Sequence, residues 1–329
     1  MEPYQELEDA FAQWIGRDRT LCVACSSGTA ALHLALESLP LPRGSTVAVP
    51  DYTMVACARA VTLAGMTPTF VNCREDLLID ARQIPEAKAA MPVHVYGRRC
   101  DMEAVHHWAQ KTSSLVLEDM AEIHGVLPHP KTHAACWSFY KNKIVGGEEG
   151  GMVAFRHANW AGKARRLRTL GFTPRHDFAH EPRGHNYRLA NALAELILES
   201  LHDYEENVVR RRMVEQWYDE RVPEEWQMPW RDAPWVYDLR VPGMTRAQQY
   251  AIVSRMNEAG IDARMGFLPM TAQQEYRGET GPAALRAADE VMYLPIWPDM
   301  AESDAEVVTA ALEAAVADVL HEIPPFRGT

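Results

Sequence analysis

The chain has 329 residues, of which 47% are hydrophobic and 24% charged, so it is long enough for one large domain and a smaller one. Its formal net charge of −12 argues against a nucleic-acid partner, because phosphate binding favours a basic surface. No stretch approaches the roughly 18 uninterrupted apolar residues of a membrane span, and the acidic N-terminus is unlike a signal peptide. The sequence therefore predicts a cytoplasmic protein with no membrane partner.

Strand and helix patterns alternate along the first half of the chain. An amphipathic helix is expected at Tyr4–Trp14, where apolar residues recur at helical spacing. The alternation that follows is typical of βαβ units and a mostly parallel sheet. Strands are expected at Leu21–Cys25, Thr46–Val49, Thr69–Val71, Pro92–Tyr96, Leu115–Leu117, Cys136–Tyr140 and Met152–Phe155, and helices at Ala30–Leu39, Val55–Ala64 and Met102–Lys111.

A second, smaller domain is expected after a long helix. Leu189–Tyr218 contains no glycine or proline and is predicted to form one continuous helix. Proline and tryptophan then become frequent, which indicates a linker. We expect an α/β large domain over residues 1–218 and a small α+β domain over residues 219–329. The small domain should contain strands at Trp235–Val241 and Met292–Leu294, a helix at Thr245–Gly260 and a final helix.

The six cysteines are scattered, and only Cys22 and Cys25 form a C-x-x-C pair. Such a pair could indicate a metal or redox site, which would predict bound zinc or a disulfide. Because no second pair follows and both residues lie in a predicted buried strand, we interpret the cysteines as reduced packing residues. No metal site is predicted.

The first segment that could carry chemistry is Ser26–Ala30, directly after a predicted strand and at the start of a helix. Small residues there allow backbone N–H groups to approach an anion, and the helix dipole favours negative charge. This arrangement suits a phosphate group. Taken alone, however, the same residues favour an ordinary helix cap with a tight turn.

The second segment is the end of a predicted strand, at Glu118 and Asp119. A carboxylate at the end of a buried strand needs a partner, because isolated burial of the charge is unfavourable. A protonated ring nitrogen would be a suitable partner. The alternative is a pair of carboxylates that face solvent at the mouth of the strand.

The third segment contains Lys143, followed by the glycine-rich run Gly146–Gly151. A lysine held in a cleft beside such a turn can have a lowered pKa and act as a Schiff-base nucleophile. A solvated loop lysine is the alternative. A phosphate cradle, a strand-end acid and a loop lysine in this order are consistent with a site for pyridoxal 5′-phosphate (PLP).

Several segments together resemble the DegT/DnrJ/EryC1/StrS family of fold-type I, PLP-dependent sugar aminotransferases. The resemblance extends over nearly the whole chain, and its last two segments are similar to perosamine-synthase-like members. The segments are Ser26–Leu36, Val49–Val61, Pro92–Gly97, Leu117–Gly125, Cys136–Val153, Gly184–Leu201, Gly260–Met270 and Met292–Pro298.

This resemblance implies roles for particular residues. Lys143 would form the Schiff base with PLP and act as the acid and base of the reaction, and Asp119 would pair with the pyridine nitrogen. Gly28, Thr29 and Ser138 would hold the phosphate, Glu122 would lie near the O3′ side of the cofactor, and Asn186 would reach the phosphate across a homodimer interface.

Each of these roles has a structural alternative. Asn186 could cap the helix that follows it, Ser138 could pack at a strand end, and Glu122 could be a solvated first-turn glutamate. His94 and His124 also lie in the family segments. We interpret these two histidines as packing or hydrogen-bonding residues rather than catalysts.

Two parts of the sequence depart from the family pattern. Met54 stands where the family commonly has an aromatic residue that stacks on the cofactor ring, so a thioether would cover that face unless Tyr52 compensates. The usual Thr-Thr-Gly-Glu-Gly-Gly run is replaced by Gly146–Gly151, which places an additional acid, Glu148, close to the site.

The expected activity is transfer of an amino group from glutamate or glutamine to a nucleotide-linked keto-deoxysugar. Arg264 is a candidate contact for the nucleotide or its diphosphate, with a structural ion pair as the alternative. A cyclitol or aminoshikimate-type ring is the alternative substrate. A non-catalytic descendant of the family is a further alternative, which would have lost its bound PLP.

Overall fold

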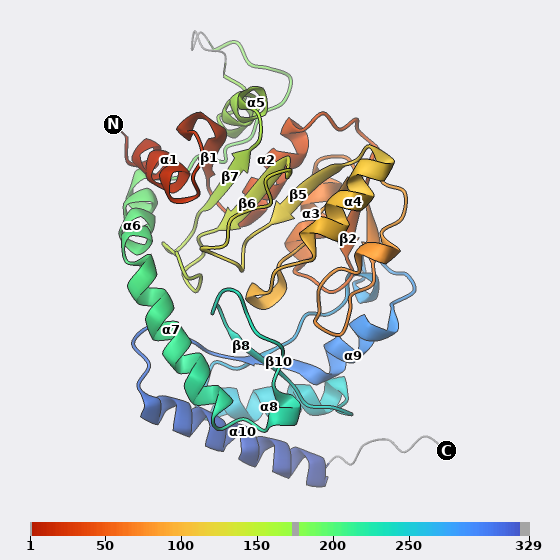
Figure 1. Ribbon diagram of the computed structural model, residues 1–329, viewed down its shortest axis with the longest axis vertical. Coiled ribbons are helices and arrows are strands. Elements are labelled where there is room, and N and C mark those ends of the chain that lie inside the picture. Colours follow the sequence, from red (N-terminus) through yellow and green to blue (C-terminus); the bar gives the residue numbers. More distant parts are fainter. Residues whose placement is uncertain (1, 173–177, 323–329) are drawn as a thin grey trace.

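The computed structural model describes residues 2–172 and 178–322 and contains two β-sheets, each with its own cluster of buried hydrophobic side chains (Figure 1). The N-terminal half of the chain forms the larger sheet. The smaller sheet lies below it in this view, beside the last helices. No helix in these described ranges combines the length and the apolar character that a bilayer crossing demands.

The larger sheet has seven strands in the order β1-β7-β6-β5-β4-β2-β3, and only β7 runs antiparallel to its neighbours. The predicted mostly parallel sheet is therefore confirmed. Buried parallel strands are expected to be continuously apolar, and β1, which runs in the same direction as the parallel strands, is buried along its whole length. The strands are β1 (Cys22–Cys25), β2 (Thr46–Pro50), β3 (Thr67–Val71), β4 (Ala89–Ala90), β5 (Leu115–Asp119), β6 (Ala134–Ser138) and β7 (Gly151–Phe155).

Helices pack on this sheet at the predicted places. Helix α2 contacts β6 and β7, and α1 contacts both β1 and the later helix α6 (Asn191–His202). The N-terminal helix buries Leu7 and Phe11, as its apolar spacing predicts. The helices of this part are α1 (Pro3–Trp14), α2 (Gly28–Ser38), α3 (Val55–Leu63), α4 (Met102–Thr112) and α5 (Ala158–Arg168).

The strand predicted at Pro92–Tyr96 is wrong. The strand in this region is β4, at Ala89–Ala90, and only a single bridge from Val93 to Asp119 continues it. Proline has no N–H for the sheet, and the chain then turns at Tyr96, whose φ of 51° lies in the left-handed region. At this turn the chain leaves the sheet, beside the carboxyl ends of the parallel strands.

The single helix predicted at Leu189–Tyr218 is also wrong, because two helices occupy this segment: α6 (Asn191–His202) and α7 (Tyr204–Asp219). Asp203 joins them with φ −86° and ψ 6°, outside regular helical geometry. Tyr204 packs edge-on against Trp14 and donates a hydrogen bond to the backbone carbonyl of His124. These contacts anchor the bend, from which α7 runs toward the smaller sheet (Figure 1).

The smaller sheet has three antiparallel strands in the order β8-β10-β9. Val214 and Tyr218 of α7 belong to its hydrophobic cluster, so α7 contributes to this second core. The domain boundary between residues 218 and 219 stays a prediction. The elements are β8 (Tyr237–Arg240), α8 (Arg246–Glu258), β9 (Arg264–Met265), α9 (Pro282–Glu290), β10 (Val291–Leu294) and α10 (Glu302–Glu322).

A buried ion-pair network joins the two parts of the molecule. Arg98, which follows the turn at Tyr96, donates two hydrogen bonds of 2.8 Å to the carboxylate of Asp238 on β8. Arg231 donates to the same carboxylate at 2.7 Å. All three side chains are buried, so their charges depend on compensation within the network, to which Glu215 adds a second carboxylate for Arg231 at 3.4 Å.

Replacing Asp238 with alanine is expected to lower the free energy of unfolding by about 3–5 kcal/mol, because the buried guanidinium of Arg98 loses its counter-charge and that of Arg231 keeps only Glu215. Urea unfolding monitored by circular dichroism measures the loss. Asp299→Ala is the matched control, since it breaks an exposed pair with Arg210 and should change stability by less than about 1 kcal/mol. An equal loss of unfolding free energy in the two variants would mean that the buried network stabilises the protein no more than an exposed ion pair does.

Candidate active site

A cavity of about 410 Å³ lies at the carboxyl ends of the parallel strands, the position where open α/β sheets place their ligands. It gathers most of the residues that the sequence singled out. The residues that line it are Ser27, Gly28, Thr29, Leu32, Met54, Ala56, Val93, Asp119, Ala121, Glu122, Cys136, Trp137, Ser138, Tyr140, Asn142, Lys143, Glu149, Trp235, Phe267 and Tyr293.

One end of the cavity is formed by the N-terminus of α2. Ser27 caps this helix by accepting a hydrogen bond from the N–H of Ala30 at 3.1 Å. The N–H groups of the first helical turn have no partner within a helix, so those of Gly28 and Thr29 are suited to an anion. A Cβ atom at Gly28 would lie 2.7 Å from the Cβ of Ser138, so glycine permits the close approach of α2 to β6.

Asp119 is a buried acid at the end of β5. Its carboxylate accepts hydrogen bonds from the N–H of Ala121 at 2.9 Å and from the Cys57 thiol at 3.1 Å. Burial raises the pKa of Asp119, although these two donors favour its charged form. Neither donor is a cation, so the carboxylate can still pair with a protonated ring nitrogen.

Glu118 points to the opposite side of β5, as alternation along a strand requires. It is buried, and it accepts hydrogen bonds from the N–H of His129 and from the Thr132 hydroxyl, and pairs with His94 at 3.0 Å. Glu118 therefore belongs to a structural network behind the sheet. The alternative of two solvent-facing carboxylates is wrong, because both acids are buried.

Lys143 lies in the turn between β6 and β7, with its Nζ atom 3.4 Å from the ring centroid of Trp235. The Trp235 indole N–H donates to the backbone carbonyl of Asn142 at 3.0 Å, which fixes the ring against the turn. Gly147 lets the turn pass close to α6, since a Cβ there would lie 2.5 Å from the Ile197 side chain. The lysine is thus held in the cavity wall rather than solvated in a mobile loop.

Glu122 and Lys143 share the buried part of the cavity. Burial raises the pKa of Glu122 to about 7, although the charge of Lys143 and the N–H of Tyr96 favour its ionised form. Burial likewise lowers the pKa of Lys143 to about 8, although Glu122 and Asp119 favour its protonated form. A lysine with this pKa has a substantial neutral fraction near physiological pH, as a nucleophilic amine requires.

The lowered pKa predicts that Lys143 in PLP-free protein reacts with an amine reagent half-maximally near pH 8. At that pH, only about 0.4% of an ordinary lysine is neutral. Acetylation over a pH series, with the modified peptides quantified by mass spectrometry, measures this reactivity. Lys141 is exposed in the same turn and provides the internal control for reagent delivery and digestion. Half-maximal reaction of Lys143 well above pH 8 would contradict the prediction.

Of the two parts of the sequence that depart from the family pattern, each contributes one residue to the cavity. Met54 lines it and is half exposed, whereas Tyr52 is buried and directs its hydroxyl to the hydroxyl of Tyr96 and the N–H of Phe267. Tyr52 therefore does not replace the missing aromatic at position 54. Both glutamates of the glycine-rich run are exposed, and Glu149 lines the cavity whereas Glu148 does not.

Asn186 and Arg264 do not line this cavity. Asn186 lies in a separate hollow with Arg168 and Arg188, and its side-chain oxygen accepts hydrogen bonds from Arg188. Arg264 forms an exposed ion pair with Asp262 at 2.6 Å, and its strand partner Tyr293 does line the cavity. Arg264 is therefore positioned beside the cavity wall on the side of the smaller sheet.

The two histidines of the family segments form internal hydrogen bonds. His94 bridges Glu118 and the N–H of Cys100, and His124 accepts from the N–H of Val145 at 3.0 Å. Burial lowers the pKa of His124 to about 3. Burial also raises the pKa values of both Cys22 and Cys25 to about 12, so neither thiol favours the reactive thiolate.

Sequence reasoning did not identify the aromatic residues of the cavity as site residues: Trp137 and Tyr140 near Lys143, and Trp235, Phe267 and Tyr293 farther along the chain. The last three come from the region after α7, 92 or more residues beyond Lys143. Phe267 and Tyr293 lie inside segments that carry the family resemblance, which was a usable signal. For Trp235, the only signal in the sequence was the local enrichment in tryptophan and proline.

The residues present fit PLP. A helix N-terminus and Ser138 can bind a phosphate, Asp119 offers a buried carboxylate for a ring nitrogen, and Lys143 offers an amine with a lowered pKa. The sequence predicted these groups separately, on three distant segments of the chain, and the structure brings them together in one cavity.

Comparison with known proteins agrees with this geometry. Residues 2–313 match the model of the DegT/DnrJ/EryC1/StrS aminotransferase family. The chain is 31% identical to GDP-perosamine synthase of Caulobacter vibrioides, covering 94% of this chain and 88% of that protein. It is also 31% identical to a UDP-N-acetyl-3-dehydro-alpha-D-glucosamine 3-aminotransferase of Acidithiobacillus ferrooxidans, covering 85% and 80%.

Solved structures share the fold as well. DesV of S. venezuelae superimposes with a TM-score of 0.84 at 28% identity, covering 95% of this chain and 89% of that one. The chain therefore belongs to the DegT/DnrJ/EryC1/StrS aminotransferase family and is a PLP-dependent aminotransferase of fold-type I.

Proposed function

We propose that this enzyme transfers an amino group from glutamate, or glutamine, to the carbonyl group of a nucleotide-linked keto-deoxysugar. The observation that carries the proposal is the similarity over more than four fifths of the chain to two proteins named for amino sugars on GDP and UDP. The cavity supports it, since apolar and aromatic walls surround a few polar groups, as in many small-molecule sites.

PLP would supply an electron sink for the substrate carbon that loses or gains the amino group. Lys143 would hold the cofactor covalently and afterwards carry the proton at its Nζ atom, a task that suits an amine with a pKa of about 8. Asp119 would keep the ring nitrogen protonated. Gly28, Thr29 and Ser138 would bind the phosphate through N–H and hydroxyl groups.

Glu122 and Met54 would bound the cofactor on two sides. Glu122, held by the N–H of Tyr96 at 2.8 Å, would face the oxygen substituent of the ring. Met54 would cover one ring face with its thioether in place of an aromatic ring, which leaves a softer and less rigid wall. Arg264, beside Tyr293, would contact the diphosphate of the sugar nucleotide.

The proposal includes a homodimer with shared sites. Asn186 lies outside the cavity of its own chain, which is consistent with a role toward the phosphate in a partner chain. Co-expression of Lys143→Ala and Asn186→Ala chains tests this arrangement. Mixed dimers would regain one intact site if the residues act across the interface, whereas residues acting within one chain would give no recovery of activity.

The direct test is amino transfer in both directions. Purified enzyme with ¹⁵N-glutamate should convert UDP-N-acetyl-3-dehydro-alpha-D-glucosamine, or a GDP-linked keto-sugar, into a ¹⁵N-labelled amino sugar detected by mass spectrometry. In reverse, GDP-perosamine should donate its amino group to 2-oxoglutarate. Activity only on a keto-cyclitol would replace the proposed substrate class, and absence of label from every carbonyl would overturn the proposal.

A further inference from the structure

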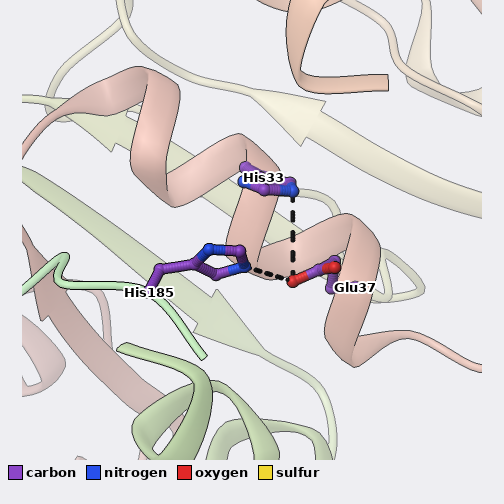
Figure 2. Close-up of side chains that lie close together, drawn as sticks. All are labelled: His33, Glu37 and His185. Atoms are coloured by element: carbon purple, nitrogen blue, oxygen red, sulfur yellow. Dashed lines mark hydrogen bonds and ion pairs between the residues drawn. The ribbon is translucent and has the colours of Figure 1, made fainter. Parts of the chain in front are cut away.

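A cluster of two histidines and one glutamate lies outside the cavity, on the far part of the helix that forms its phosphate end (Figure 2). His33 and Glu37 belong to α2 and are separated by four residues, so they share one face of the helix. His185 comes from the segment that precedes α6 and points toward Glu37 from outside the helix.

The three side chains converge on a small space. The Nε2 atom of His185 lies 2.7 Å from Oε2 of Glu37, and the Nε2 atom of His33 lies 3.9 Å from the same oxygen. One nitrogen or oxygen atom from each residue lies within 4.8 Å of the other two. Bond lengths of about 2.0–2.2 Å to a tetrahedral ion place its ligand atoms roughly 3.3 Å apart, so modest side-chain rotations would suffice.

Among the residues that the structure describes, none forms a hydrogen bond with one buried ring nitrogen of His33. The residue is 3% exposed, and its Nε2 atom forms no hydrogen bond with any residue that the structure describes. Its Nδ1 atom is 3.1 Å from the hydroxyl of Tyr187, which orients the ring. Burial lowers the pKa of His33, as does His185, whereas Glu37 and the Leu63 backbone raise it.

An unpartnered imidazole nitrogen that faces a carboxylate is an arrangement that a cation would complete. A neutral imidazole binds metal through one nitrogen while the other is held by an outer hydrogen bond, as Tyr187 holds His33. The Glu37 side chain is 7% exposed and would supply the carboxylate oxygen. The His185 side chain is 25% exposed, so the cluster is open to solvent on that side.

We propose that His33, Glu37 and His185 bind a divalent transition-metal ion, with zinc as the ion that this ligand set suits best. Two imidazoles and one carboxylate are ligands that zinc commonly takes, with water in the fourth position. The guanidinium of Arg183 lies 3.9 Å from the other carboxylate oxygen of Glu37 and is half exposed, so it can remain there as an outer contact.

Bound zinc would join α2 to the segment that contains Asn186. Tyr187 already accepts a hydrogen bond through its backbone carbonyl from the N–H of Ser26, at 2.9 Å, directly before α2. An ion at the three side chains would add a second connection on the same helix. It would act as a structural clamp behind the phosphate end of the cavity, and it takes no part in amino transfer.

Zinc binding to the PLP-loaded enzyme, prepared without a polyhistidine tag and stripped with a chelator, tests the proposal. Titration against a chromophoric chelator should give one zinc ion per chain. His185→Gln and Glu37→Gln should each weaken zinc binding by at least ~10–100-fold. Loss of a residue that only supports a metal ligand already has an effect of that size. His107→Gln removes an exposed histidine of α4 and should leave binding unchanged.

X-ray absorption on the zinc-loaded wild-type enzyme provides a readout that does not depend on how the variants fold. Two imidazole ligands and one or more oxygen ligands are expected. No stoichiometric binding, binding that both variants retain, or a coordination shell with fewer than two imidazoles would overturn the proposal. In those cases, His185 and Glu37 form only a hydrogen-bonded pair.

Discussion

Replacement of Lys143 by alanine is expected to lower kcat for amino transfer by at least about 10³-fold. The variant loses both the amine that would hold PLP and the group that would carry the proton, and acid–base catalysis alone contributes about 10²–10⁴-fold. Because Lys143 lies beside Trp235 in the cavity wall, no other lysine of the turn can take its place. Steady-state kinetics with glutamate and a keto-sugar measures the loss.

Lys141→Ala is the matched control for this variant. Lys141 lies in the same turn but is exposed and does not line the cavity, so its removal should leave kcat within about twofold. Thermal unfolding of both variants shows whether the turn keeps its fold. A Lys143→Ala enzyme with wild-type turnover, or equal losses in both variants, would mean that a different amine performs the reaction.

Replacement of Asp119 by asparagine is expected to separate activity from stability. The variant should lose about 10²–10³-fold in kcat, the range for removal of one preorganised electrostatic contact. An amide at this position cannot keep the ring nitrogen of PLP protonated. The N–H of Ala121 can still donate to the amide oxygen, so the local backbone should be retained.

The PLP-free Asp119→Asn protein should unfold at the same temperature as PLP-free wild type or at a higher one. Burial raises the pKa of Asp119, so the folded state binds that proton more tightly than the unfolded chain does. The carboxyl therefore destabilises the folded state increasingly as pH rises above about 4, and the amide removes this effect. A clear fall in melting temperature at neutral pH would contradict this explanation.

Glu118→Gln is the control on the other side of the same strand. Glu118 accepts several hydrogen bonds behind the sheet and does not line the cavity, so its replacement should lower the melting temperature. Its effect on kcat should be small. The neighbouring acids of β5 should thus show opposite patterns, one affecting mainly catalysis and the other mainly stability.

The parts of the site that are local in sequence could be predicted. Asp119 ends a buried strand, Gly28 and Thr29 start a helix directly after another, and Lys143 precedes a glycine-rich turn. Parallel strands end at the same edge of a sheet, so these three segments had to meet there. The fold class followed from the same alternation of strands and helices.

The failures came from contacts between distant segments. The bend at Asp203 involves no glycine or proline, and it is held by Tyr204 against Trp14 and His124. Trp235 reaches Lys143 across 92 residues of sequence and has no local motif. Packing of this kind depends on how the smaller sheet docks on the larger one. The spacing of apolar residues along the sequence does not indicate that arrangement.

The cluster of His33, Glu37 and His185 shows the same limit. The spacing of His33 and Glu37 on one helix was visible, but the third side chain is 148 residues beyond Glu37. Only the fold brings them together. The same helix thus contributes its first turn to the cavity and its later turns to a separate polar cluster.

Borohydride reduction of the PLP-loaded enzyme, followed by digestion and peptide mass spectrometry, tests the central claim most directly. Reduction fixes the cofactor permanently to the amine that holds it. The structure predicts a single pyridoxyl-modified peptide, with the modification on Lys143 and an unmodified Lys141. Modification of any other lysine, or a wild-type protein that retains no PLP to reduce, would contradict the assignment of this cavity as the active site.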